Sequence, residues 1–278
     1  MLRPQVRLTE AIGYLDVLVR KLDTDLANVH NAGAIQRYLD WVDQAGRELP
    51  DRFTDPTLTE LLSTEHYWDV RRANDAGTPH LIAHELRAHL GWLREMRAHL
   101  QLYLPFADLP GSPVILDTNV LLHFDPFREE IDQARWLVIT RLPPGAPLRV
   151  IIAHQVLDEL DKHSHSGDKR LARRAREVQR TLDAFMDDPL PGKPREVRPG
   201  ASWMTLEVLP DPPGHRRQGD EDTEILDRAE FLAQVTGTPV TCVTADAGMR
   251  VRGRVRELLA ERSNVRMVAM PPDLRLPD

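Results

Sequence analysis

The alternation of short apolar runs with helical patterns after residue 105 constrains the fold of this chain most. The apolar runs are rich in Val and Ile and predict five strands, at residues 114–116, 149–152, 203–208, 240–243 and 265–269. Helical patterns lie between them, near residues 129–141, 155–186, 222–236 and 247–261. The Pro- and Gly-rich stretch 187–200 reads as a loop. Because apolar strands that alternate with helices form parallel sheets, we expect an α/β domain over residues 106–278.

Residues 1–105 follow a different pattern, because their apolar residues recur every three or four positions. Two such stripes span residues 12–29 and 82–100, a spacing typical of helices that pack against a core. No strand-like alternation interrupts them. We therefore expect an all-helical domain over residues 1–105, which could bind RNA, dock a protein partner or form a homo-oligomer.

The composition bears on compartment and partners. No run approaches the ~18 apolar residues of a membrane span, and no apolar segment of the secretory type follows Met1, so we expect no membrane partner. Cys242 is the single cysteine and cannot form an internal disulfide, so we expect a cytoplasmic location. The net charge of −7 argues against a general polyanion binder, since phosphate affinity comes from excess Lys and Arg.

Acidic residues follow several of the predicted strands. The first strand leads into Asp117 and Asn119, and the fourth leads into Thr244 and Asp246. Because ligands bind beyond the carboxyl ends of the strands in an open α/β sheet, we expect these residues at one rim. The second strand leads into a helix that carries Glu159 in its opening turns, and the loop before the helix near residue 222 supplies Asp222. Together the predicted rim carries four carboxylates, those of Asp117, Glu159, Asp222 and Asp246.

Four like charges at one rim repel each other unless a cation compensates them. Clusters of carboxylate oxygens bind hard cations such as Mg²⁺ or Mn²⁺. Two such ions can hold the attacking water and the leaving oxygen of a phosphodiester in line. The pattern therefore predicts metal-dependent phosphoryl hydrolysis, although each acid alone could be a helix cap or part of a solvated face. Whether Asp220 or Glu221 shares the role of Asp222 stays open.

Four motifs in order resemble those of the PIN domain family of nucleases. They are Val-Ile-Leu-Asp117-Thr118-Asn119, Val156-Leu157-Asp158-Glu159, Asp222-Thr223-Glu224-Ile225-Leu226 and Val243-Thr244-Ala245-Asp246. Trp136 lies between the first two motifs, and its presence there makes the chain resemble the branch of PhoH-associated and mRNA-decay PIN domains. The resemblance covers residues 112–270 and departs from the family at Ala245, where Asn is common.

The resemblance implies a PIN-like parallel sheet and an endoribonuclease that cleaves RNA with a metal-activated water. It implies Mg²⁺ or Mn²⁺ as the cofactor, with Asp117, Glu159, Asp222 and Asp246 as metal ligands. Thr118, Asn119 and Thr244 would orient the acids or the water through hydrogen bonds. Two other classes stay open, a catalytically silent PIN scaffold that binds RNA or protein and a toxin-type ribonuclease of a toxin–antitoxin pair.

The helix that follows Gly167 carries a basic face about opposite its apolar stripe. The cations on and beside this face are Lys169, Arg170, Arg173, Arg176 and Arg180. Such a face can follow a phosphate backbone through nonspecific contacts, although charge runs are usually solvated surface. Arg250, four residues after Asp246, adds a cation at the edge of the site. We therefore predict RNA contacts at these six positions.

A group of histidines lies in the N-terminal region. His80 and His84 stand four residues apart, as two zinc ligands on one helix do, but the sequence indicates no third ligand. His84-Glu85 and His89 are spaced one residue too long for the helical zinc-protease motif. We therefore interpret them as ordinary surface or interface histidines.

Overall fold

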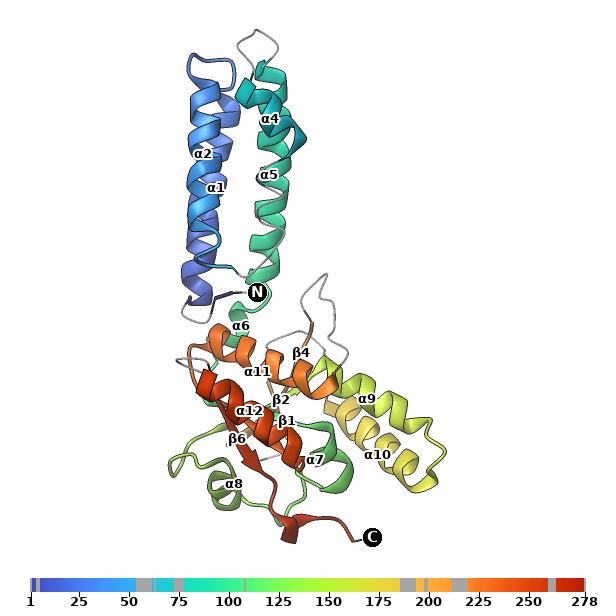
Figure 1. Ribbon diagram of the computed structural model, residues 1–278. Helices are drawn as coiled ribbons and strands as arrows, with labels where there is room; N and C mark the ends of the chain where they lie inside the picture. The colour runs from blue at the N-terminus through green and yellow to red at the C-terminus, as the bar shows by residue number, and fades with distance from the viewer. Residues whose placement is uncertain are drawn as a thin grey trace. The chain divides into compact units, whose positions relative to one another are not determined.

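The computed structural model divides the chain into two compact units, Met1–Leu102 and Tyr103–Asp278 (Figure 1). The structure describes residues 2–277 except for 4–5, 54–61, 63, 73–77, 108, 186–193, 198–199, 212–219 and 260–263. Within the described part of the chain, none of the helices combines the length and the apolar character that a membrane span requires.

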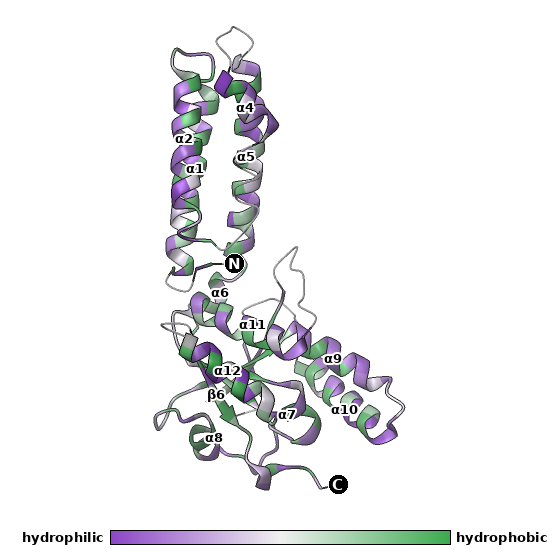
Figure 2. Ribbon diagram, in the orientation of Figure 1, coloured by the Kyte–Doolittle hydropathy of each residue, from purple (hydrophilic) through white to green (hydrophobic). Residues whose placement is uncertain are grey.

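The first unit is built from helices α1 (Leu8–Ala27), α2 (Ala34–Glu48), α4 (Glu65–Arg72) and α5 (Thr78–Gln101). The long helices α1 and α5 pack against each other, and α2 and α4 also contact α5. Leu8, Leu15 and Leu22 of α1 are buried at intervals of seven residues, which places them on one face of the helix. In Figure 2 these helices carry hydrophilic and hydrophobic residues in alternation along their length. The prediction of a helical N-terminal region is confirmed.

The second unit contains a six-stranded sheet in the order β3-β4-β2-β1-β5-β6. Its strands are β1 (Ser112–Leu116), β2 (Leu148–Ala153), β3 (Arg195–Glu196), β4 (Met204–Leu209), β5 (Val240–Thr244) and β6 (Val265–Ala269). All neighbouring strands run parallel except β3, which is antiparallel to β4. The prediction of an α/β fold with a mostly parallel sheet is confirmed.

Helices connect the strands and flank the sheet (Figure 1). They are α6 (Leu104–Ala107), α7 (Thr118–His123), α8 (Gln133–Thr140), α9 (His154–Ser164), α10 (Lys169–Phe185), α11 (Glu221–Thr236), α12 (Ala247–Leu259) and the 3₁₀ helix η1 (Pro272–Leu274). Every residue of β2 and of β5 is buried, as expected of strands covered on both faces.

The direction in which strands are added to the sheet reverses at β1. From β1 the chain passes to β2 and then to β4 on one side, and it returns to β5 on the other side of β1. The gap beyond the carboxyl ends of β1 and β5 is thus a topological switch point, the usual place for a ligand in an open α/β sheet. Asp117 follows β1 directly, and Asp246 follows β5 by two residues.

A buried ion pair joins the neighbouring strands β2 and β4. The Arg149 guanidinium of β2 donates two hydrogen bonds to the Glu207 carboxylate of β4, with N–O distances of 2.8 and 2.9 Å. Arg149 Nη1 also donates to the carbonyl oxygens of Phe106 at 3.0 Å and Leu109 at 3.2 Å. The pair therefore ties the segment that leads into β1 to the middle of the sheet.

The structure adds three details to the residue ranges predicted from the sequence. The segment 155–186 holds two helices, α9 and α10, because the Asp168 side chain accepts hydrogen bonds from the backbone N–H groups of Arg170 and Leu171 and begins a new helix. The six-residue helix α7 follows β1 without a periodic pattern of its own. The predicted loop 187–200 contains the two-residue strand β3, which is too short to leave a signal in the sequence.

Candidate active site

The β1–β5 pair positions Asp117 and Thr244 against each other. The Thr244 hydroxyl donates a 2.6 Å hydrogen bond to Asp117 Oδ2, and the Asp117 backbone N–H donates to the Val243 carbonyl oxygen at 3.0 Å. Asn119 Nδ2 lies 3.4 Å from the same Asp117 oxygen. Asp117 is only 1% exposed. The sequence-predicted residues Asp117, Asn119 and Thr244 thus form one hydrogen-bonded cluster at the switch point.

Burial sets the electrostatics of this cluster. Removal from water raises the pKa of the Asp117 carboxyl above its ordinary value, while the hydrogen bonds from Thr244 and Asn119 act in the opposite direction. Burial disfavours the charged form of an acid, and donors that face the charged form favour it. The surroundings of Asp117 are therefore arranged for a carboxylate, but they do not fully compensate its charge.

Glu159 lies on α9 within electrostatic reach of Asp117. It is buried, and Gln155, one turn earlier on the same helix, donates a 3.1 Å hydrogen bond to Glu159 Oε1. Burial raises the pKa of Glu159, and repulsion from Glu221 and Asp117 adds to the shift, while Thr118 and Gln155 oppose it. The sequence reasoning missed Gln155, although its spacing of four residues from Glu159 is a signal of contact on a helix.

Asp246 stands at the end of β5 and caps α12. Its backbone N–H donates to Thr244 Oγ1 at 2.9 Å, and its Oδ1 accepts from the Met249 backbone N–H at 2.9 Å. The hydroxyl of Thr244 therefore links Asp246 to Asp117. Asp246 therefore caps the helix that follows it, as its position in the sequence allows. Only Oδ1 takes part in the capping bond to Met249, so Oδ2 is not used by it.

Asp222 lies in the first turn of α11 and forms an ion pair with Arg252 of α12. Its neighbour Glu221 pairs with Lys162 of α9, with an N–O distance of 2.5 Å. Of these two acids, Glu221 is the one whose charge raises the pKa of Glu159. In the part of the chain that the structure describes, no three of the four predicted acids have ligand atoms within 4.8 Å of one another.

A cavity of about 430 Å³ opens beside the Asp117 cluster. Its lining includes Asn119 and Asp246 together with three basic side chains, His123, Arg250 and Arg275. Arg250 Nη1 donates to the Asp246 carbonyl oxygen at 3.1 Å, so the predicted basic residue does lie at the edge of the site. The sequence reasoning missed His123 and Arg275.

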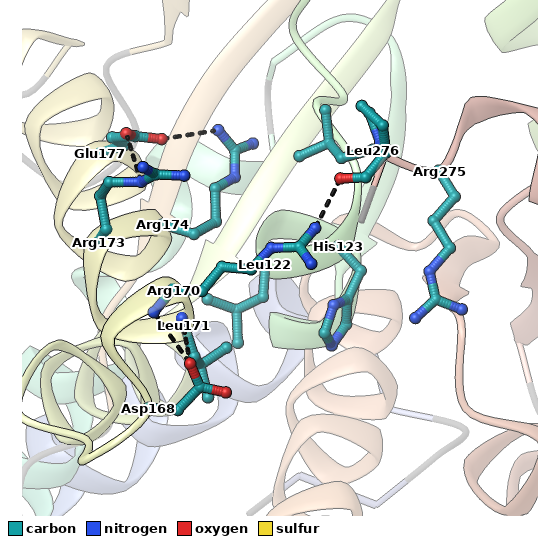
Figure 3. Close-up of a pocket in the computed structure, with 11 residues that line it drawn as sticks. Leu122, His123, Asp168, Arg170, Leu171, Arg173, Arg174, Glu177, Arg275 and Leu276 are labelled. Atoms are coloured by element: carbon teal, nitrogen blue, oxygen red, sulfur yellow. Dashed lines mark hydrogen bonds and ion pairs between the residues drawn. The ribbon is translucent and has the colours of Figure 1, made fainter.

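A second cavity, of about 420 Å³, shares His123 and Arg275 with the first, and its lining includes three arginines of α10 together with the acids Asp168 and Glu177 (Figure 3). Figure 3 shows the His123 ring between the side chains of Arg170 and Arg275. Partial burial and then the positive charges of Arg275 and Arg170 lower the pKa of His123. Because they share His123 and Arg275, the two cavities adjoin, and we call their basic lining residues, from Arg250 beside Asp246 to the arginines of α10, the basic path.

The structure separates the predicted RNA-binding face of α10 into two groups. Arg170 and Arg173 line the second cavity. Arg176 and Arg180 lie farther along the helix, exposed, with each Nε donating to a backbone carbonyl of α10 itself. Lys169 is exposed at the first position of the helix.

A family model for the PIN domain matches residues 114–264, from β1 to the residue before β6. No curated protein matches the chain. PIN domains are generally nucleases, and they typically depend on divalent metal ions. Since the match spans more than half of the chain and contains the whole Asp117–Thr244 cluster, the chain belongs to the PIN domain family.

Proposed function

We propose that this PIN domain is a metal-dependent endoribonuclease that hydrolyses RNA phosphodiester bonds. The observation that carries the proposal is the pair of buried carboxylates, Asp117 and Glu159, beside the switch point of the sheet. Burial raises the pKa of both groups, and the charge of Asp117 raises the pKa of Glu159 further. Two neighbouring acids in such a place need a cation if both are to stay ionised at neutral pH.

The donor set suits Mg²⁺ or Mn²⁺. Asp117, Glu159 and Asp246 offer carboxylate oxygens, the ligands that hard divalent cations prefer. Among the described residues, no Lys or Arg forms an ion pair with Asp117 or Glu159, so a bound cation supplies the missing compensation. Asp222 joins this set if it exchanges Arg252 for the metal, and Glu221 is the alternative fourth acid.

The protein residues have separate tasks in this proposal. When bound, a divalent ion polarises the phosphate and lowers the pKa of water, which provides the nucleophile. Thr244 and Asn119 fix the orientation of the Asp117 carboxylate, and Gln155 does the same for Glu159. Such fixed partners around a ligand typically change metal affinity or activity by 10–100-fold when they are removed.

The two basic cavities support a polyanionic substrate. An RNA strand that passes from the cavity with the arginines of α10 to the cavity beside Asp246 runs past His123 and Arg275. This path brings one of its phosphates to the acids. Contacts of this kind recognise the phosphate backbone and not the base sequence. This local group of cations is compatible with the net charge of −7, because the net charge of a chain does not describe how its charges are distributed, and the acids of the rim account for part of that charge.

The test is a cleavage assay on single-stranded and structured RNA, and on DNA, with Mg²⁺ or Mn²⁺ and with EDTA. We expect RNA cleavage that EDTA abolishes, and at least about a 100-fold loss of kcat in Asp117→Asn and in Glu159→Gln, since metal ligation contributes several kcal/mol to such a step. Asp161→Asn, an exposed acid on the same helix as Glu159, is the matched control and keeps full activity. Cleavage that survives Asp117→Asn refutes the proposal, and a wild type that binds RNA but never cleaves it indicates a silent scaffold.

A further inference from the structure

The first unit brings together two histidines and a glutamate from two different helices. His84 and Glu85 lie on α5 and His66 lies on α4. One ligand atom from each side chain lies within 4.8 Å of the other two. The rings of His66 and His84 meet edge to face, with 5.2 Å between their centroids. The proposed nuclease site has no use for this group, which belongs to the other compact unit.

Glu85 is held as a metal ligand is usually held. It is only 2% exposed, and its Oε2 accepts hydrogen bonds from the Tyr38 hydroxyl at 3.2 Å and from the Thr64 hydroxyl at 2.5 Å. Its other oxygen, Oε1, lies 3.7 Å from His84 Nδ1. One carboxylate oxygen is thus anchored by donors, and the second is left toward the histidine. Among the described residues, no Lys or Arg pairs with this buried carboxylate.

His66 provides an independent sign that a partner is missing. Its Nδ1 atom is buried, and it has no hydrogen-bond partner within the part of the chain described. The nearest acid, Asp69, has its Oδ2 at 3.8 Å from this nitrogen, which is too far for a hydrogen bond. A buried polar atom of this kind calls for an explanation such as an ion, and the lone pair of a neutral imidazole is a good metal ligand.

We propose that His66, His84 and Glu85 bind a zinc ion. Two imidazole nitrogens and one carboxylate oxygen are a common ligand set for Zn²⁺, whereas Mg²⁺ and Ca²⁺ prefer oxygen ligands alone. Bonds between zinc and its ligand atoms are about 2.0–2.2 Å long. The three ligand atoms already lie within 4.8 Å of each other, so a small movement of the side chains toward a common centre allows these bonds to form. Tyr38 and Thr64 orient the carboxylate, and a water completes the tetrahedron.

The sequence pattern could not reveal this set, because its ligands come from separate helices. His80, the partner of His84 at a spacing of four residues, is not part of the group and instead lies near His30, with ring centroids 6.3 Å apart. A bound ion would join the eight-residue helix α4 to the long helix α5. His80 and His84 are both exposed residues of the same helix, so His80 provides a matched control.

The test is a zinc titration of the metal-free full-length protein in competition with a chromogenic chelator. The Asp117→Asn variant is used as the background, so that the carboxylate site of the PIN domain contributes little. We expect one zinc ion per chain, and a rise in Kd of at least about tenfold in His66→Gln and in His84→Gln, since even partners of ligands have effects of 10–100-fold. His80→Gln leaves the Kd unchanged.

Cobalt substitution gives a measurement that needs no change at the histidines. We expect Co²⁺ in the Asp117→Asn protein to give the intense visible absorption of a four-coordinate ion, and zinc to displace it. No zinc uptake in this background, or an equal Kd in His66→Gln, His84→Gln and His80→Gln, overturns the proposal. Because neither readout involves RNA, their outcome is independent of the nuclease assay.

Discussion

The second unit contains a buried ion pair between Arg149 and Glu207, and its stability should fall when the Glu207 carboxylate is replaced by a neutral group. Glu207→Gln keeps the shape of the side chain but leaves the Arg149 guanidinium, only 2% exposed, without its counter-ion. Removal of one partner of a buried pair costs about 3–5 kcal/mol of unfolding free energy. For a unit of this size, each kcal/mol corresponds to about 2–4 °C in Tm, so the transition should fall by about 6–20 °C.

The assay is differential scanning calorimetry of the full chain, in which the transition of the second unit is assigned by its shift. The matched control is Asp273→Asn, which breaks the exposed Arg135–Asp273 pair of the same unit. Exposed pairs contribute about 0–1 kcal/mol, so the control should move the transition by a few degrees at most. The double variant Arg149→Met/Glu207→Leu removes both charges and should recover part of the lost stability.

If Glu207→Gln lowers the Tm by no more than the Asp273→Asn control does, the reasoning is refuted, because the Arg149 guanidinium would then not need its carboxylate partner. A double variant no more stable than Glu207→Gln would show that the loss comes from packing or from the bonds to Phe106 and Leu109. Those two carbonyls lie in the segment that leads into β1. We therefore also expect the single variant to lose the proposed nuclease activity at temperatures below its transition.

The remaining predictions concern binding, pH and reactivity. Arg275→Gln should weaken RNA binding and reduce the slope of log K against log salt by about 0.7, measured by fluorescence anisotropy; an unchanged slope would remove Arg275 from the RNA path. Burial lowers the pKa of His89 to about 4, whereas a histidine in the unfolded chain has a pKa of about 6.5. As the pH falls below about 6.5, the unfolded chain therefore binds this proton before the folded chain does. In EDTA, the free energy of unfolding should keep its full value above that pH and decrease by about 3 kcal/mol toward pH 4; urea unfolding of His89→Gln should lack this decrease. The Cys242 thiol is buried and its pKa is raised, so it should react with a thiol reagent only after unfolding, and rapid labelling of the native protein would contradict this.

The features that the sequence predicts well are those with a local physical cause. The Val- and Ile-rich runs identify the parallel strands because both faces of those strands are buried. Asp117 and Asp246 can be placed at one rim because the ends of parallel strands meet there. The break before α10 is harder to predict, since it depends on the short side chain of Asp168 competing with a continuous helical pattern.

The features that the sequence does not predict depend on contacts between distant segments. Arg275 joins the basic path only because residues 274–276 run back beside α7, with the Leu276 N–H donating to the His123 carbonyl oxygen at 2.9 Å. The pairing of Asp222 with Arg252 likewise joins two helices. His66 approaches His84 through helix packing. No spacing rule applies to such pairs, because tertiary contacts set their distances.

The hydrogen bond between Thr244 and Asp117 spans 127 residues, and this separation has a consequence for biosynthesis. A ribosome that adds about 5–20 residues per second needs roughly 6–25 s to make the chain between them. During that interval the centre of the sheet lacks β5, and Asp117 lacks its hydroxyl partner. The cluster of the proposed nuclease site is therefore incomplete in a nascent chain until β5 and Thr244 have emerged, and only 34 of the 278 residues follow Thr244.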